Sequence, residues 1–172
     1  MNSIKLNLSV TVDDGIAGIL PDEEMHDVVV AVLAHEGVGR PCELSVSLVS
    51  DEEIARLNAE WRGVDRATDV LSFECERPSD PDLAEGEPCE LGDIVLAPGF
   101  LRRQAARMGT TEADEARLML VHGTLHLLGF DHMEPDEARD MQGREDDVLS
   151  SIPTDGTLTD VVLADHRSEE EA

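Results

Sequence analysis

The chain has 172 residues, of which 39 are acidic and 13 basic, and its formal net charge is −26. Such a charge opposes non-specific binding to nucleic acid, because attraction to phosphate scales with the basic charges offered. The length suffices to bury a core without disulfides or a structural metal, and no apolar run approaches the roughly 18 residues of a membrane span.

The first half of the chain predicts two strands, each followed by a helix. Apolar and polar residues alternate over residues 4–12 and again over 43–50, which is typical of half-buried strands. Between them, residues 21–37 open with proline and acidic residues and close with glycine, the pattern of a helix. The second helix is expected to start at Ser50, which is placed to form a capping box with Glu53.

The second half predicts two short strands and then helices. Strands are expected at 68–73 and 92–97, on either side of an acidic loop that contains prolines. Helical patterns follow at 100–109, 111–129 and 135–151. The middle helix is apolar nearly all round, which predicts a buried central position.

The order βαβαββααα predicts an α/β fold in which about four strands form one small mixed sheet covered by helices, with a buried metal-binding helix. We expect residues 1–152 to form a single metallohydrolase-like domain. Residues 153–172 are expected to be an acidic, solvated C-terminal tail.

Three cysteines, Cys42, Cys75 and Cys89, are an odd number without the spacing of a disulfide framework. The N-terminal residues lack the basic and continuous apolar regions of a signal peptide. We therefore expect reduced thiols and a cytoplasmic protein. Cys75 and Cys89 are assigned to the polar loop, so neither is expected to bind metal and both are expected to react with thiol reagents.

Three histidines occur in the segment VHGTLHLLGFDH, residues 121–132. His122 and His126 lie four residues apart and project from one face of a helix. Gly129 permits the chain to reverse, which can return His132 to the same place. Three imidazoles suit zinc and leave a fourth position for water, as in catalytic sites. We predict one Zn²⁺ per chain on these three residues.

The same spacing, HxxxHxxGxxH, also matches the metzincin metalloproteases. Those enzymes require a glutamate directly after the first histidine as general base. This chain has Gly123 there, which cannot accept a proton. The metal geometry is shared, whereas the proteolytic base is absent.

The segments HGTLHLLGFDH, LNAEWRGVDRATDVLSFE and LGDIVL resemble the YbeY family, bacterial metal-dependent endoribonucleases and ribosomal RNA maturation factors. The resemblance covers roughly residues 40–150. It implies zinc on the three histidines, a catalytic, phosphate-contacting Arg62, and single-strand-specific cleavage in 3′-end maturation of small-subunit (16S) rRNA and ribosome quality control. It also implies an rRNA precursor, small-subunit ribosomal proteins and an assembly GTPase as partners, and no membrane.

Several residues near the three histidines are further candidates for the site. Arg62 is suited to hold a phosphodiester and offset developing charge, while Asp131 and Asp69 are candidates to orient a ligand or pair with arginine. Phe130 stands where the family more often has tyrosine, so a hydroxyl is not required there. One Trp, three Phe and no Tyr argue against a broad base-stacking platform.

Two alternatives remain at this point: a metallohydrolase of another substrate such as a peptide, and a ribosome-assembly factor with a structural zinc. The fourth ligand discriminates between an enzyme and a structural site, because structural zinc sites are closed by protein. The residues that could close the site are Cys75, Cys89, His26, His35 and His166.

Overall fold

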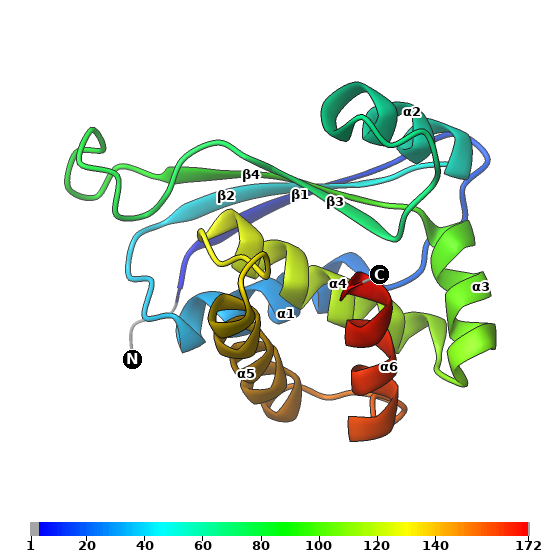
Figure 1. Ribbon diagram of the computed structural model, residues 1–172. Helices are drawn as coiled ribbons and strands as arrows, with labels where there is room; N and C mark the ends of the chain where they lie inside the picture. The colour runs from blue at the N-terminus through cyan, green and yellow to red at the C-terminus, as the bar shows by residue number, and fades with distance from the viewer. Residues whose placement is uncertain (1–3, 172) are drawn as a thin grey trace.

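The computed structural model describes residues 4–171 and contains one four-stranded sheet with helices on both faces (Figure 1). The strands lie in the order β1-β2-β4-β3. The first three are parallel, and β3 runs antiparallel to β4, which confirms the predicted small mixed sheet. The strands are β1 (Leu6–Val12), β2 (Cys42–Leu48), β3 (Val70–Glu74) and β4 (Cys89–Leu96).

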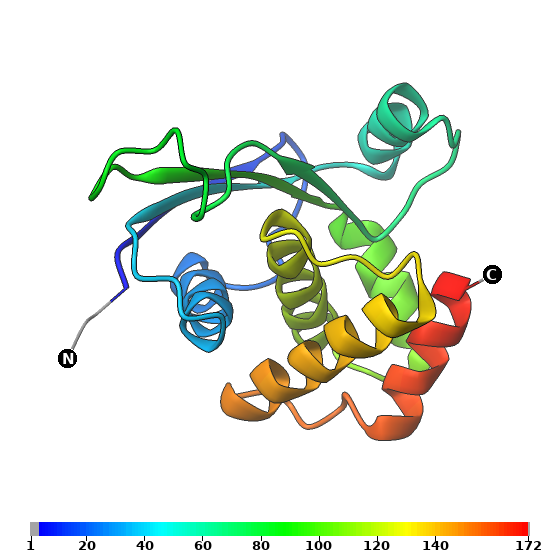
Figure 2. The same cartoon turned by 60° about the vertical axis from the view of Figure 1, so that its left-hand side comes forward.

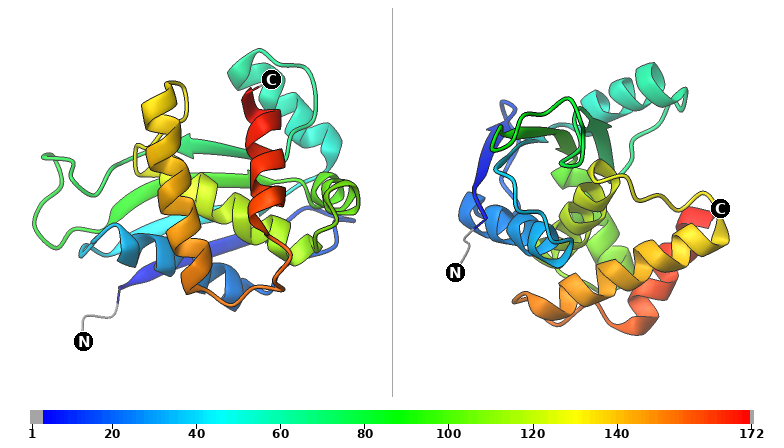
Figure 3. Two further views of the ribbon diagram at one scale, coloured as in Figure 1. Left: turned by 60° about the horizontal axis from the view of Figure 1, so that its bottom comes forward. Right: turned by 90° about the vertical axis from the view of Figure 1, so that its left-hand side faces the viewer.

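Six helices lie within the described residues. Helices α1, α4, α5 and α6 lie on one side of the sheet, and α2 lies on the other, as the rotated views make clear (Figures 2 and 3). Their bounds are α1 (Asp22–His35), α2 (Asp51–Arg62), α3 (Pro98–Met108), α4 (Glu112–Leu127), α5 (Pro135–Ser151) and α6 (Asp160–Glu171). Within residues 4–171, none of these helices combines the length and apolar character needed to cross a bilayer.

Two predicted helix starts are confirmed by side-chain caps. Ser50 Oγ accepts a hydrogen bond from the Glu53 N–H at 3.1 Å, and Thr111 Oγ1 accepts one from the Asp114 N–H at 3.1 Å. Each cap satisfies a backbone donor that the first turn of a helix leaves without a partner. Sequence-local chemistry therefore sets where α2 and α4 begin.

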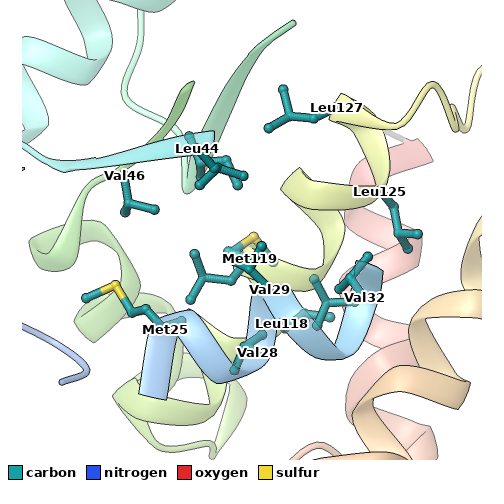
Figure 4. Packing of buried hydrophobic residues seen from close by; sticks show 14 of the residues in the cluster. Met25, Val28, Val29, Val32, Leu44, Val46, Leu118, Met119, Leu125 and Leu127 are labelled. Carbon is teal, nitrogen blue, oxygen red and sulfur yellow. The ribbon is translucent and has the colours of Figure 1, made fainter. Parts of the chain in front are cut away.

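The main core fills the space between the sheet, α1 and the central helix α4 (Figure 4). Val29 of α1, Met119 of α4 and Val46 of β2 are buried in it. A smaller apolar cluster lies on the opposite face, where Val95 of β4 packs with Ile54 of α2. Successive residues of β4 thus pack into different cores on the two faces of the sheet. Nearly all residues of α4 are buried, as predicted.

A β-bulge in β4 depends on a glycine. Glu43 pairs with Glu90, but Leu44 pairs with Gly92, so Leu91 is the extra residue. Gly92 has φ +135°, and a Cβ there would overlap the carbonyl oxygen of Phe73 on β3. Only glycine can therefore bring β3 and β4 together at this point.

The C-terminal region differs from the expected solvated tail, because it contains helix α6. Leu163 and His166 of this helix are buried, with exposed fractions of 6% and 7%. His166 Nε2 lies 3.1 and 3.0 Å from the two carboxylate oxygens of Glu115 on α4. Leu163 and His166 lie three residues apart on one face of α6, and through them the helix packs against the rest of the protein. Two buried positions within an acidic segment were too few to predict this packing from the sequence.

The expected position of Cys89 was also wrong. Strand β4 begins at Cys89, three residues earlier than predicted, and pairs it with Cys42 of β2. Both of these cysteines are buried, whereas Cys75 is exposed. Burial is the main cause that raises the pKa of the Cys89 thiol to about 12, so it carries almost no thiolate at neutral pH.

We accordingly predict that one cysteine, Cys75, reacts rapidly with a thiol reagent in the native protein, and that all three react after denaturation. Mass spectrometry of the labelled protein measures this. Cys75→Ser should abolish the rapid phase, and Cys89→Ser should leave it unchanged. Rapid labelling of two native thiols would contradict the buried position of Cys89.

Candidate functional site

The buried helix α4 and the turn after it bring the three predicted histidines together. The ligand atoms of His122, His126 and His132 all lie within 4.8 Å of one another. The Nε2 atoms of His122 and His126 are 3.0 Å apart, as the spacing of four on a helix predicts. This cluster is able to hold a metal ion.

The return of His132 depends on the reversal that follows α4. Gly129 has φ +104°, and the N–H of Phe130 donates to the carbonyl oxygen of Leu125 at 3.1 Å. The carboxylate of Asp131 then accepts a hydrogen bond from the His132 N–H at 2.7 Å. Asp131 therefore fixes the backbone that carries the third histidine.

A buried carboxylate orients the first histidine. His122 Nδ1 donates to Glu145 Oε2 at 2.9 Å, and both residues are buried, with exposed fractions of 6% and 4%. With its proton on Nδ1, the ring presents the lone pair of Nε2 to the other histidines. Sequence reasoning missed Glu145. The signal was its position on the apolar stripe of α5, which also contains Met141, Val148 and Leu149.

The histidine at the centre of the cluster is held in its neutral form. Burial, followed by repulsion from His122 and His132, lowers the pKa of His126 to about 4. At neutral pH the ring therefore carries no charge, and a metal does not have to displace a proton from it. The donor set fits a divalent metal that prefers imidazole nitrogen.

Gly123, the residue at the position of the protease base, faces the sheet. A Cβ at Gly123 would lie 3.1 Å from Ile94 Cδ1 and 3.1 Å from Ser72 Oγ. The absence of a side chain lets α4 approach β3 and β4 closely. A glutamate at this position would point into the sheet and away from the histidines.

One cavity of about 1450 Å³ brings all the predicted site residues together. The three histidines lie on its wall with the other predicted residues, Arg62, Asp69 and Asp131. Arg62 is the last residue of α2 and is exposed. Among residues 4–171, no carboxylate lies within ion-pair distance of Arg62 or Arg66, and both arginines line the cavity. Their positive charge is available to an incoming anion.

A buried polar network supports a second part of the cavity wall. Asp69 accepts a hydrogen bond from the Val70 N–H at 2.8 Å, and its other oxygen lies 3.4 Å from Gln104 Nε2. Gln104 in turn contacts Glu115, which also binds His166. Asp69 therefore fixes the start of β3 and joins it to α3, α4 and α6. Sequence reasoning did not anticipate this network, because its members come from four separate segments.

The pair formed by His166 and Glu115 is held in its charged form. Burial alone would lower the pKa of His166, but its hydrogen bond and attraction to Glu115 outweigh that effect and raise the pKa. Burial alone would raise the pKa of Glu115, but hydrogen bonds from His166 and Thr110 outweigh it and lower the pKa. The two opposite shifts predict a stability that depends on pH.

Known proteins resemble this chain over most of its length. The sequence profile described as Endoribonuclease YbeY matches residues 19–153. A protein of that name from an Exiguobacterium species is 42% identical over 132 residues, which are 72% of this chain and 84% of the relative. Another, from Salinispora tropica, is 44% identical over 135 residues, which are 73% of this chain and 86% of the relative.

The fold is similar to a solution structure of a Thermotoga maritima protein, with a TM-score of 0.56. The likeness covers 94% of this chain and 93% of that one, at 22% sequence identity. It supports the arrangement of strands and helices described above.

We predict that His126→Ala removes most of the metal bound by the purified protein and lowers its melting temperature, because metal that binds only the native state stabilises it. Elemental analysis and thermal unfolding measure the two effects. His35→Ala is the matched control, since His35 is exposed and pairs with Glu36 and Asp147. Full metal content in His126→Ala would refute the assignment.

We also predict that His166→Gln lowers the free energy of unfolding by about 1–3 kcal/mol at pH 6, because it leaves Glu115 with a weaker partner. The raised pKa of His166 means that its contribution is complete below about pH 6.5 and is lost as pH rises through the folded-state pKa. The contribution of Glu115 is lost at low pH instead. Urea unfolding at pH 6 and pH 9 should therefore show a smaller difference at pH 9. An equal difference at both values would count against the charged pair.

Proposed function

This chain belongs to the YbeY endoribonuclease family, and we propose that it is a zinc-dependent, single-strand-specific endoribonuclease acting in 3′-end maturation of small-subunit (16S) rRNA. The observation that carries the proposal is the shared cavity of three histidines and the unpaired Arg62. By resemblance to the family, we extend the proposal to ribosome quality control in the cytoplasm. The proposed partners are an rRNA precursor, small-subunit ribosomal proteins and an assembly GTPase.

Zinc fits the donor set, and the surroundings of the cluster favour an open coordination position. In the part of the chain that the structure describes, the metal-binding group consists of three histidines. The side chains that could have closed the site are engaged or placed elsewhere. Cys75 is exposed, Cys89 is buried beside Cys42, His26 binds the Leu6 carbonyl oxygen, His35 pairs with Glu36, and His166 pairs with Glu115. This arrangement supports an enzyme over a structural zinc site.

The protein's own residues would bind and orient the substrate. When bound, Zn²⁺ supplies a Lewis acid and a water molecule that ionises near neutral pH. In this proposal Arg62, which lines the same cavity, holds a phosphodiester oxygen through paired N–H donors, a contact that would strengthen as charge develops. Glu145 keeps the proton of His122 on Nδ1, and Asp131 keeps the third histidine in position. Buried side chains beneath the cluster exclude bulk water from His122.

The alternative that the protein hydrolyses peptides lacks a catalytic base at the residue after His122. Gly123 has no side chain, and its backbone position faces Ile94 and Ser72 rather than the histidines. A carboxylate base of the metzincin kind therefore has no place in α4. The unpaired arginines favour a substrate that carries phosphate.

We predict that Arg62→Ala lowers RNA cleavage by about 10- to 100-fold while zinc content and melting temperature stay unchanged, since a charge-assisted contact to the transition state is lost. Arg62→Lys should restore only part, because an ammonium replaces a planar fork. Cleavage of a single-stranded rRNA fragment by metal-loaded protein measures this. Arg56→Ala is the matched control, because Arg56 lies on the same helix but pairs with Glu53 and Glu60.

Two outcomes would change the proposal. Normal cleavage by Arg62→Ala together with inactive His122→Ala would keep the metal in the mechanism and remove Arg62 from it. Normal rRNA processing by both variants would favour the assembly factor with a structural zinc.

A further inference from the structure

The only tryptophan of the chain is exposed at the rim of the proposed active site. Trp61 lies in the last turn of α2, lines the same cavity as the histidines, and is 65% exposed. Tryptophan is a large apolar residue that is highly buried on average in folded proteins. The exposed ring of Trp61 lies on the cavity wall beside two arginines and offers a flat apolar surface to a ligand there.

A second aromatic ring holds Trp61 in place. Phe73 of β3 meets it edge to face, with ring centroids 5.9 Å apart and an angle of 68° between the planes. Phe73 is itself half-buried against the smaller core. An edge-to-face contact covers at most one face of the indole, so the other face stays open for a flat partner.

The surroundings of Trp61 fit a strand of nucleic acid. Arg62 follows it directly and Arg66 lies four residues further on, both exposed and both on the cavity wall. A nucleobase on the indole would place its neighbouring phosphates near these two guanidinium groups. Stacking also adds affinity that does not depend on long-range charge, which suits a protein whose net charge repels RNA.

We infer that Trp61, steadied by Phe73, stacks on one unpaired nucleobase of the RNA substrate while Arg62 and Arg66 hold the adjacent phosphates. The inference rests on the proposed endoribonuclease function and names how it selects its substrate. Bases within a duplex are covered on both faces by their neighbours, whereas a base in a single strand can turn out onto the ring. One tryptophan provides a site for one base, which agrees with the scarcity of aromatic residues.

The single tryptophan allows a direct test by fluorescence. The wild-type protein is titrated with a short 2′-O-methyl RNA of mixed sequence, which resists cleavage, and with the same strand annealed to its complement. The single strand should quench Trp61 fluorescence saturably, and the duplex should not. In a parallel anisotropy measurement with labelled single strand, Trp61→Leu should bind on the order of 10-fold more weakly, and Trp61→Phe should recover part of the affinity.

Controls separate stacking from general effects. Val161→Ala removes another exposed apolar side chain, 71% exposed on α6, and should bind the strand like the wild-type protein. Because Trp61 is exposed, its variants should keep the melting temperature and metal content of the wild type. In cleavage assays, Trp61→Leu should raise KM more than it lowers kcat, as expected for lost substrate binding.

The outcomes distinguish this inference from the proposed function. Quenching by single strand and weaker binding by Trp61→Leu support stacking even if no metal-loaded preparation cuts RNA, in which case only the proposed activity fails. Normal KM in Trp61→Leu, or equal quenching by duplex, overturns the stacking site while cleavage itself stands. Quenching by a ribosomal protein but not by RNA also overturns it and identifies Trp61 as a protein contact.

Discussion

The structure depends on one constraint: a helix buried on nearly every side carries imidazoles that must find polar partners. An unpaired polar group inside a core costs about 1–3 kcal/mol. His122 meets this need through Glu145, which places α5 against α4. Gly123 lets α4 approach the sheet, and the reversal at Gly129 returns His132 to the remaining open side. The contacts that pack α4 into the core therefore also position the histidines of the candidate metal site.

The same helix uses buried acids to bind the C-terminal segment. The carboxylate of Asp114 accepts hydrogen bonds from the backbone N–H groups of Asp155 and Thr157, both at 3.0 Å, and pairs with Arg117 at 2.7 Å. These contacts outweigh the effect of burial and lower the pKa of Asp114. The next residue, Glu115, binds His166. Some of the many acidic residues thus have a structural role inside the protein. The net charge of the chain does not reveal which residues these are.

Local patterns were sufficient to predict the parts of the fold whose cause is local. Period-two alternation located β1 and β2, Ser50 marked the start of α2, and the spacing of the histidines predicted their meeting. The parts that were missed depend on contacts between distant segments. Glu145 reads as a surface acid until α5 is packed on α4, and the bulge at Gly92 is set by a carbonyl group of the neighbouring strand.

The walls of the cavity come from different parts of the chain, and Arg62 and Arg66 lie on one of them. Residues of α2, of α6 and of the turn that carries His132 all line the cavity. The α2 wall carries Arg62 and Arg66, whereas the α6 wall carries Glu169, which is paired with Arg107. The family profile ends at residue 153, so it includes the first wall but not the second. Because opposite charges attract, a polyanion that contacts the histidines is drawn toward the end of α2, where Arg62, Arg66 and the indole of Trp61 lie.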